Sequence, residues 1–129
     1  MQTHGYERGA AWKQSLAMLD QTRALTDAFE SDPFGLAGKL RSLALELPVF
    51  AATIYEQFDY DSATSFSNRA TQHLFQLWLQ AQLAEHLGLL TKRQLGDLRK
   101  KIDTLDAMFA ELPDALFEDD GEDEPAQAA

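Results

Sequence analysis

The stretch Asp32-Pro33-Phe34-Gly35-Leu36 opens the apolar helical run that decides the fold. Asp32 can cap a helix with its carboxylate, and Pro33 fits the first helical position, where a missing N–H costs nothing. Apolar residues then recur at spacings of three and four, which predicts one apolar helix face about six turns long. That face comprises Leu36, Leu40, Leu43, Leu47, Ala51, Ile54 and Phe58. Pro48 lies inside the run, so we expect a kink there rather than a helix end.

The same apolar spacing elsewhere in the chain predicts four helices. They cover about residues 10–30, 33–57, 63–87 and 92–112. The expected buried face of the first comprises Trp12, Leu16, Leu19, Leu25 and Phe29. Because the links are short, consecutive helices should be antiparallel neighbours. The sequence therefore predicts an all-α, antiparallel up-down-up-down four-helix bundle over residues 10–113.

The ends of the later helices carry their own signals. Asp61 or Ser62 can cap the third helix. Gly88 can end it in the left-handed conformation, with Leu89 or Leu90 packing back on the last turn. Thr91-Lys92-Arg93-Gln94 fits a capping box for the fourth helix. An a/d repeat follows until Pro113, which we expect to close the helix, and it comprises Leu95, Leu98, Ile102, Leu105, Phe109 and Leu112.

Composition limits the function classes. With 129 residues, 45% of them hydrophobic, the chain can form one domain with a sizeable core. The absence of cysteine excludes disulfides, thiolate catalysis and cysteine-based metal sites. Residues 1–9 have no apolar signal core and should be flexible, and no apolar run is long enough to cross a membrane. We therefore expect a soluble, cytoplasmic protein.

The formal charge of −10 is concentrated at one end of the chain. Seven of the 21 acidic residues follow Pro113, where no basic residue occurs. Like-charge repulsion and a lack of apolar surface predict a disordered acidic tail over residues 114–129. Such a tail either keeps the protein in solution or occupies a basic surface in competition with nucleic acid.

The second and third helices have more apolar surface than one bundle seam needs. A helix that is apolar over so much of its circumference is buried on more than one side. Closed symmetric homo-oligomers are the commonest use of such a surface, and an unusually wide monomer core is the alternative. The predicted oligomer interface comprises Phe50, Phe75, Trp78, Leu79 and Leu83.

Catalytic and metal-binding patterns are missing from the sequence. His4 lies near the N-terminus, and His73 and His86 fall near opposite faces of one helix, so they cannot share a metal ion. There is no Glu-x-x-His pair for a di-iron site, no serine nucleophile motif and no glycine-rich phosphate loop. We therefore predict no catalytic residues, no metal and no cofactor.

One charge feature has functional potential. Five of the chain's 11 basic residues fall within ten positions: Lys92, Arg93, Arg99, Lys100 and Lys101. Pairs seven apart share a helix face and could bind phosphates electrostatically. However, Asp97 and Asp103 interrupt the set, and no aromatic stacking platform accompanies it in the sequence. Three interpretations stay open: a solvated helix face, a nucleic-acid contact, or docking of the protein's own acidic tail.

These features resemble a known family. Trp12, then Phe34-Gly35-Leu36, then Leu40-Arg41 before Leu47-Pro48 occur in the order found in bacterial four-helix-bundle proteins of the ribosomal-RNA intervening-sequence family. A leucine-rich third helix ending Leu87-Gly88-Leu89-Leu90 and a capped fourth helix extend the resemblance over residues 10–112. It implies an up-down bundle that assembles into rings of five. Some members are encoded inside large-subunit ribosomal RNA genes, and a strongly basic subgroup serves diversity-generating retroelements by binding reverse transcriptase and RNA.

The chain departs from the family around the second-helix proline. Members usually read Ser-Ile-Pro-Ser-Asn-Ile-Ala-Glu-Gly, whereas this chain reads Glu46-Leu47-Pro48-Val49-Phe50-Ala51-Ala52-Thr53-Ile54. We expect a non-enzymatic, self-assembling interaction or structural module, with itself as partner, a pentamer favoured, and room for an unidentified protein partner. The alternative is an RNA or ribonucleoprotein accessory protein that uses the basic residues of the fourth helix.

Overall fold

The computed structural model describes residues 5–128, with side chains as far as Phe117. Its helices are a short 3-10 turn η1 (Tyr6–Arg8), α1 (Ala10–Asp27), α2 (Leu36–Tyr55), α3 (Tyr60–His86) and α4 (Lys92–Ala128). No strand occurs among residues 5–128. The predicted all-α class with four long helices is therefore confirmed. Residues 1–4 of the segment expected to be flexible lie outside the described residues.

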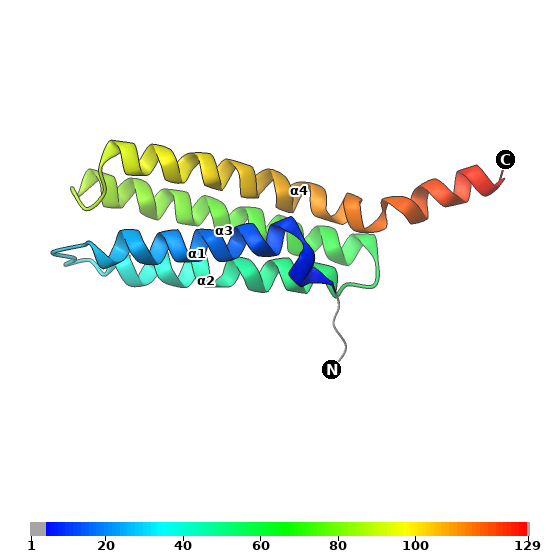
Figure 1. The fold of residues 1–129 in the computed structure, drawn as a ribbon, viewed down its shortest axis with the longest axis horizontal. Helices are drawn as coiled ribbons and strands as arrows, with labels where there is room; N and C mark the ends of the chain where they lie inside the picture. The colour runs from blue at the N-terminus through cyan, green and yellow to red at the C-terminus, as the bar shows by residue number, and fades with distance from the viewer. Residues whose placement is uncertain (1–4, 129) are drawn as a thin grey trace.

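The helices pack as a bundle in chain order (Figure 1). The α1–α2 and α3–α4 connections lie at one end, the α2–α3 connection lies at the other, and α4 continues past that second end. α1 packs on α2, α2 on α3 and α3 on α4, whereas α1 and α4 contact each other less. α1 and α3 lie diagonally across the bundle without close backbone contact. In the described part of the chain no helix is both long enough and apolar enough to cross a bilayer.

The connection between α1 and α2 is built by the stretch that opens the apolar run. The Asp32 carboxylate accepts hydrogen bonds from the backbone N–H groups of Leu36 and Ala37, each at 2.8 Å, so it caps the helix as predicted, although Gly35 and not Asp32 occupies the N-cap position. Pro33 does not lie in the helix, because a turn closes first between the Asp32 carbonyl and the Gly35 N–H. Gly35 has φ +69°, a left-handed conformation that favours glycine. The helix therefore begins three residues later than expected.

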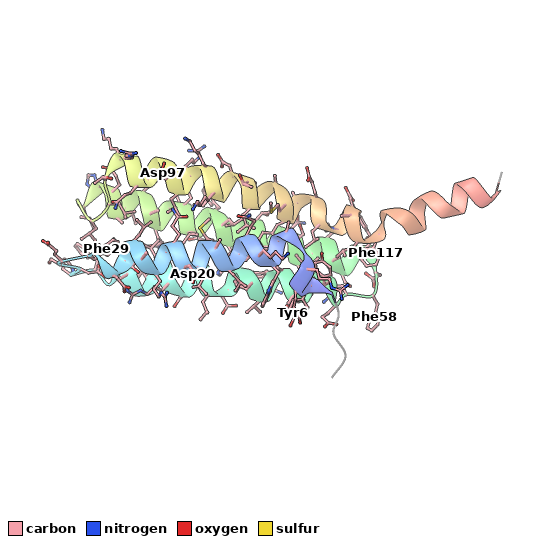
Figure 2. All side chains as sticks on the ribbon, in the orientation of Figure 1. Tyr6, Asp20, Phe29, Phe58, Asp97 and Phe117 are labelled. Carbon is pink, nitrogen blue, oxygen red and sulfur yellow. The ribbon has the colours of Figure 1, made fainter. Side chains whose placement is uncertain are left out.

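Most of the predicted face of α2 is buried. The structure buries Leu36, Leu40, Ala44, Leu47, Pro48, Ala51 and Ile54. Pro48 lies inside one continuous helix and does not end it, as the sequence predicts, and the kink expected there stays a prediction. Leu43 is only half-buried, and the prediction for Phe58 is wrong because α2 ends at Tyr55. Phe58 instead lies on the α2–α3 connection and is 99% exposed (Figure 2).

Both ends of α3 carry specific hydrogen bonds. Its cap is Asp59, whose carboxylate accepts the Ser62 N–H at 2.7 Å, so the expected cap at Asp61 or Ser62 is corrected. At the other end Gly88 has φ +81°. The Leu89 N–H donates to the Ala84 carbonyl and the Gly88 N–H donates to the Glu85 carbonyl, which together form a Schellman motif. This end is as predicted.

The start and core face of α4 also follow the sequence. Thr91 Oγ1 accepts the Gln94 N–H at 3.1 Å, and Gln94 Oε1 accepts the Thr91 N–H at 2.9 Å, which completes the predicted capping box. The buried positions of the repeat are Leu98, Ile102, Leu105, Phe109 and Leu112. The sixth, Leu95, is partly buried against the same core.

α4 does not end at Pro113, so that prediction is wrong. Pro113 has no N–H to give to the carbonyl of Phe109, four residues earlier, which would leave that buried oxygen without its helical partner. Ser67 of α3 fills the vacancy, because its hydroxyl donates to the Phe109 carbonyl at 2.5 Å. The backbone then stays helical to Ala128. The acidic, disordered character expected of residues 114–129 stays a prediction, since the side chains beyond Phe117 lie outside the described residues.

This bond between α3 and α4 can be tested by a double-mutant cycle. Ser67→Ala should lower the free energy of unfolding by about 1–3 kcal/mol, because a buried carbonyl loses its partner. In a Pro113→Ala background the new N–H at residue 113 can satisfy the same carbonyl, so Ser67→Ala should then cost much less. Urea unfolding of the four proteins measures the coupling. Equal costs in both backgrounds would contradict the role given to Ser67.

The buried face of α1 differs from the predicted one by about one position. The structure buries Ala11, Ser15, Met18, Thr22 and Thr26. Of the expected face, Leu16 is 37% exposed, and Trp12, Leu19, Leu25 and Phe29 are half-buried. Small side chains allow close approach to α2, and the hydroxyls of Thr22 and Thr26 donate to carbonyls four residues earlier in the helix. The buried hydroxyls of these two threonines are therefore satisfied without a partner from another helix.

Candidate interaction surface

An apolar stripe runs along the outer face of α3. Phe75, Leu79, Leu83 and Leu87 follow one another at every fourth position and are 57%, 36%, 50% and 45% exposed. Residues four apart form a ridge on a helix surface, so these four side chains make one continuous row. We call this row the α3 stripe. Three of its members were predicted as interface residues, and Leu87 was missed although it continues the same spacing.

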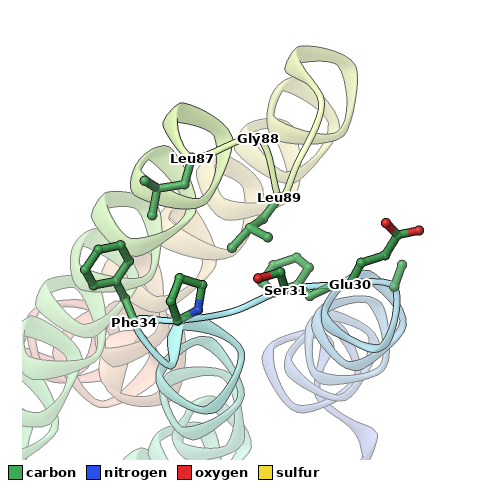
Figure 3. Close-up of a pocket in the computed structure, with 9 residues that line it drawn as sticks. Glu30, Ser31, Phe34, Leu87, Gly88 and Leu89 are labelled. Carbon is green, nitrogen blue, oxygen red and sulfur yellow. The ribbon is translucent and has the colours of Figure 1, made fainter.

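The stripe continues onto the loop end of the bundle. Phe34, on the α1–α2 connection, is 64% exposed and lines an apolar hollow together with Leu83 and Leu87. Phe34 and Leu87 also line a second hollow of about 440 Å³ between the two connections, with Gly88 and Leu89 on its other wall (Figure 3). Phe34 could not be recognised as a surface residue from the sequence, because it lies in a turn with no periodic pattern.

α3 is free of charged residues over most of its length. From Ala70 to Ala84 there is no Asp, Glu, Lys or Arg, and the polar positions on its surface are mainly glutamines. By contrast, nine of the twenty residues from Lys92 to Glu111 on α4 are charged. Interface centres are depleted in charged residues and enriched in aromatic ones. The outer face of α3 therefore has the composition of a protein interface. The outer face of α4 has the composition of a surface exposed to solvent.

Trp78 lies beside the stripe rather than in it. It is half-buried and lines the groove between α3 and α4, with the Arg99 guanidinium carbon 4.7 Å from its ring centroid. Arg99 in turn approaches Asp103 at 3.4 Å. Part of the indole surface is thus already covered within the chain, and Phe75 lies at the edge of the same groove.

Phe50 is separated from the stripe. It lies on α2, half-buried, with its ring edge-on to His73 at 5.3 Å and with Arg69 5.9 Å from its centroid. The hollow that it lines is polar and includes none of the stripe residues. The structure therefore brings Phe75, Leu79 and Leu83 together, places Trp78 next to them and leaves Phe50 on the α2 side of α3.

The environment of His73 should make stability depend on pH. Burial lowers the pKa of the imidazole below its ordinary value, against the opposing effects of Glu46 and of a backbone hydrogen bond with Leu43. Its Nε2 atom is buried and has no hydrogen-bond partner among the described residues. The unfolded chain thus takes up the proton at a higher pH than the folded chain does, so stability should fall as the pH drops below about 6.5.

We expect His73→Gln to weaken that pH dependence. Urea midpoints at about pH 7.5 and 5.5 should differ less in the variant than in the natural chain, because the residue that binds the proton on unfolding is gone. His86→Gln, at an exposed position of the same helix, is the matched control. An unchanged midpoint difference in His73→Gln would show that other groups cause the dependence.

The five basic residues of α4 are all exposed, but they do not form one face. At about 100° per residue, Lys92 and Arg99 point to the α3 side, while Lys101 points the opposite way from Arg99. Arg99 is engaged with Trp78 and Asp103. The sequence interpretation that no aromatic group accompanies these residues is corrected, since α3 supplies Trp78 and Phe75 at the edge of the set.

Among the described residues no cluster of three or more histidines and carboxylates is arranged to hold a metal ion. No model of a known protein family matches the chain, and no curated protein matches its sequence.

Proposed function

We propose that this chain is a cytoplasmic, non-enzymatic interaction or structural module: an antiparallel up-down-up-down bundle that assembles with copies of itself through the α3 stripe. The single observation that carries the proposal is the coincidence of exposure and missing charge on the outer face of α3. Three exposed apolar side chains lie within the charge-free stretch of α3 from Ala70 to Ala84, and a fourth, Leu87, follows at the end of the helix.

The size of the apolar surface supports this proposal. The stripe and Phe34 together expose on the order of 400–500 Å² of apolar surface, which is the size of the largest apolar patch on a typical single chain, and such a patch often has a function. A stable interface of ordinary size needs about 800 Å² from each partner, and the neighbouring glutamines can supply the polar rim. The resemblance to the intervening-sequence family adds the proposal of a ring of five subunits.

The test is the mass of the natural chain in solution. Native mass spectrometry and sedimentation velocity over a range of protein concentrations should show a defined oligomer, and a pentamer would support the ring. A monomer at all concentrations would overturn self-assembly. A hetero-complex recovered in place of the homo-oligomer would assign the stripe to a different protein.

A second candidate function is contact with RNA through the basic residues of α4. The observation in its favour is that Arg99 lies over Trp78, with Phe75 at the same groove, so exposed cations and aromatic rings are adjacent. Asp103 and Asp106 line that groove as well and oppose phosphate binding.

For this second function, Arg99→Glu with Lys100→Glu should abolish RNA retention at low salt, because phosphate contacts dominate such binding. Lys13→Glu with Arg23→Glu on α1 changes the net charge equally and should retain RNA. Filter binding at two salt concentrations makes the comparison. If the α4 variant retains as much RNA as the control, the RNA function is ruled out.

A further inference from the structure

A second exposed apolar surface lies on α1 and α2. Leu45 and Val49 of α2 are 56% and 53% exposed, and Leu16 of α1 is 37% exposed. We call these three residues the α1–α2 flank. None of them was predicted as an interface residue, and Leu16 was expected in the core.

Contacts between α1 and α2 place the members of this flank together. Arg41 of α2 hydrogen-bonds to Thr26 of α1 at 2.7 Å, and Gly9, just before α1, lies against the Tyr55 hydroxyl. Residue numbers thus fall along α2 as they rise along α1, which brings Leu16 level with Val49. Leu45 and Val49 follow Arg41 at spacings of four, so they lie on the exposed surface of α2 next to its side toward α1.

The flank resembles the α3 stripe in its lack of charge. From Ser42 to Tyr55, α2 has Glu46 as its one charged residue, and α1 has none between Lys13 and Asp20. Half-buried Trp12 and Leu19 widen the apolar area. The chain therefore has two charge-poor, apolar surfaces, while α4 carries the charge expected of a solvated helix.

One two-fold contact between two copies cannot cover both the stripe and the flank. The flank is formed by α1 and α2, whereas the stripe follows the outer face of α3, which has no close backbone contact with α1, so the two surfaces are separate. In a two-fold dimer the same patch meets itself, which would leave the other patch exposed to water. A head-to-tail contact, in which one patch meets the other, covers both.

We infer that the α3 stripe of one copy packs against the α1–α2 flank of the next copy. The inference rests on the proposed self-assembly and adds which surfaces meet. The stripe is a ridge on a single helix, and the flank is formed by two helices side by side, so apolar side chains on one surface can interdigitate with those on the other. Repetition of one such contact closes into a ring when the rotation between neighbouring copies allows it.

The decisive experiment mixes two variants that are each blocked on one surface. Leu83→Glu disables the stripe, and Leu45→Glu disables the flank. Each variant alone should be monomeric, since every contact needs one intact stripe and one intact flank. When the two variants are mixed in equal amounts at high concentration, the intact flank of Leu83→Glu can bind the intact stripe of Leu45→Glu. The mixture should therefore form a one-to-one dimer that grows no further, measured by native mass spectrometry.

The outcomes distinguish failure of the proposed self-assembly from failure of the stripe–flank pairing. A monomeric natural chain overturns the proposed function and this inference with it. An assembled natural chain in which Leu45→Glu assembles normally, or in which the mixed variants stay monomeric, overturns only the pairing. Both substitutions are at positions at least half exposed, and circular dichroism must show unchanged helix content.

Cysteine pairs give an independent readout, since the chain has no cysteine of its own. A Leu83→Cys chain mixed with a Leu45→Cys chain should be joined by a short bismaleimide, and each chain alone should be joined much less. Ala107→Cys, on the exposed face of α4, is the matched control partner for both. Efficient joining of Leu83→Cys to itself would show a two-fold contact and overturn the pairing.

Discussion

Phe109→Ala should lower the free energy of unfolding by about 3–5 kcal/mol, because it leaves a cavity in the centre of the core. Phe109 is fully buried, and its carbonyl is the one that Ser67 holds. Small domains are stable by only about 5–15 kcal/mol, so the loss is a large part of the total. The melting temperature should fall by roughly 10–20 °C at fixed protein concentration.

The chain offers a control with the same chemical change. Phe58→Ala removes the same side chain from a position that is 99% exposed and should change stability by no more than about 0.5 kcal/mol. Thermal and urea unfolding of both variants make the comparison. Similar losses in the two proteins would mean that the placement of Phe109 at the core centre is wrong.

Phe75→Glu with Leu79→Glu should weaken self-association by roughly 10³-fold, enough to convert an assembly into monomers at micromolar concentration. Both side chains belong to the α3 stripe, and a charge placed there would have to be buried without a partner. Helix content should be unchanged, because the two side chains lie on the outer face of the monomer. Sedimentation velocity against concentration measures the effect.

The matched control adds the same charge to α4. Thr104→Glu with Ala107→Glu alters two exposed positions on the charged helix and should leave the assembly intact. Dissociation by the control, or a Phe75→Glu/Leu79→Glu protein of natural mass, would contradict the assignment of the stripe as the interface.

The sequence predicts most of the helix ends because their signals are local. Asp32, Gly88 and the Thr91–Gln94 box act within a few residues, and their roles follow from backbone geometry alone. Pro113 is different. Whether a helix can continue through a proline depends on whether another group satisfies the freed carbonyl, and here that group comes from Ser67, far away in the sequence.

The candidate surface was predicted only in part, because spacing along one helix is visible in the sequence but packing between helices is not. The i, i+4 spacing on α3 is visible in the sequence, and it correctly marks Phe75, Leu79 and Leu83 as lying off the main seam. The buried face of α1 is not visible in the sequence, since two overlapping stripes compete and the more hydrophobic one is only half-buried. Thr22 and Thr26 satisfy their hydroxyls within their own helix, which removes the penalty that would otherwise keep threonine out of the core.

Because the buried face of α1 is small and polar, the stability of α1 in the bundle should depend on the protein concentration. Apart from Met18, the fully buried residues of α1 are alanine, serine and threonine, so its buried face is less hydrophobic than the leucine-rich faces of the other helices. Leu16, on its outer side, would be covered only when a neighbouring copy binds. Binding of a second copy to the folded chain stabilises the segment that it contacts, and this stabilisation grows with the logarithm of the protein concentration. Amide hydrogens of α1 should therefore exchange fastest in dilute solution and slow down as the protein is concentrated.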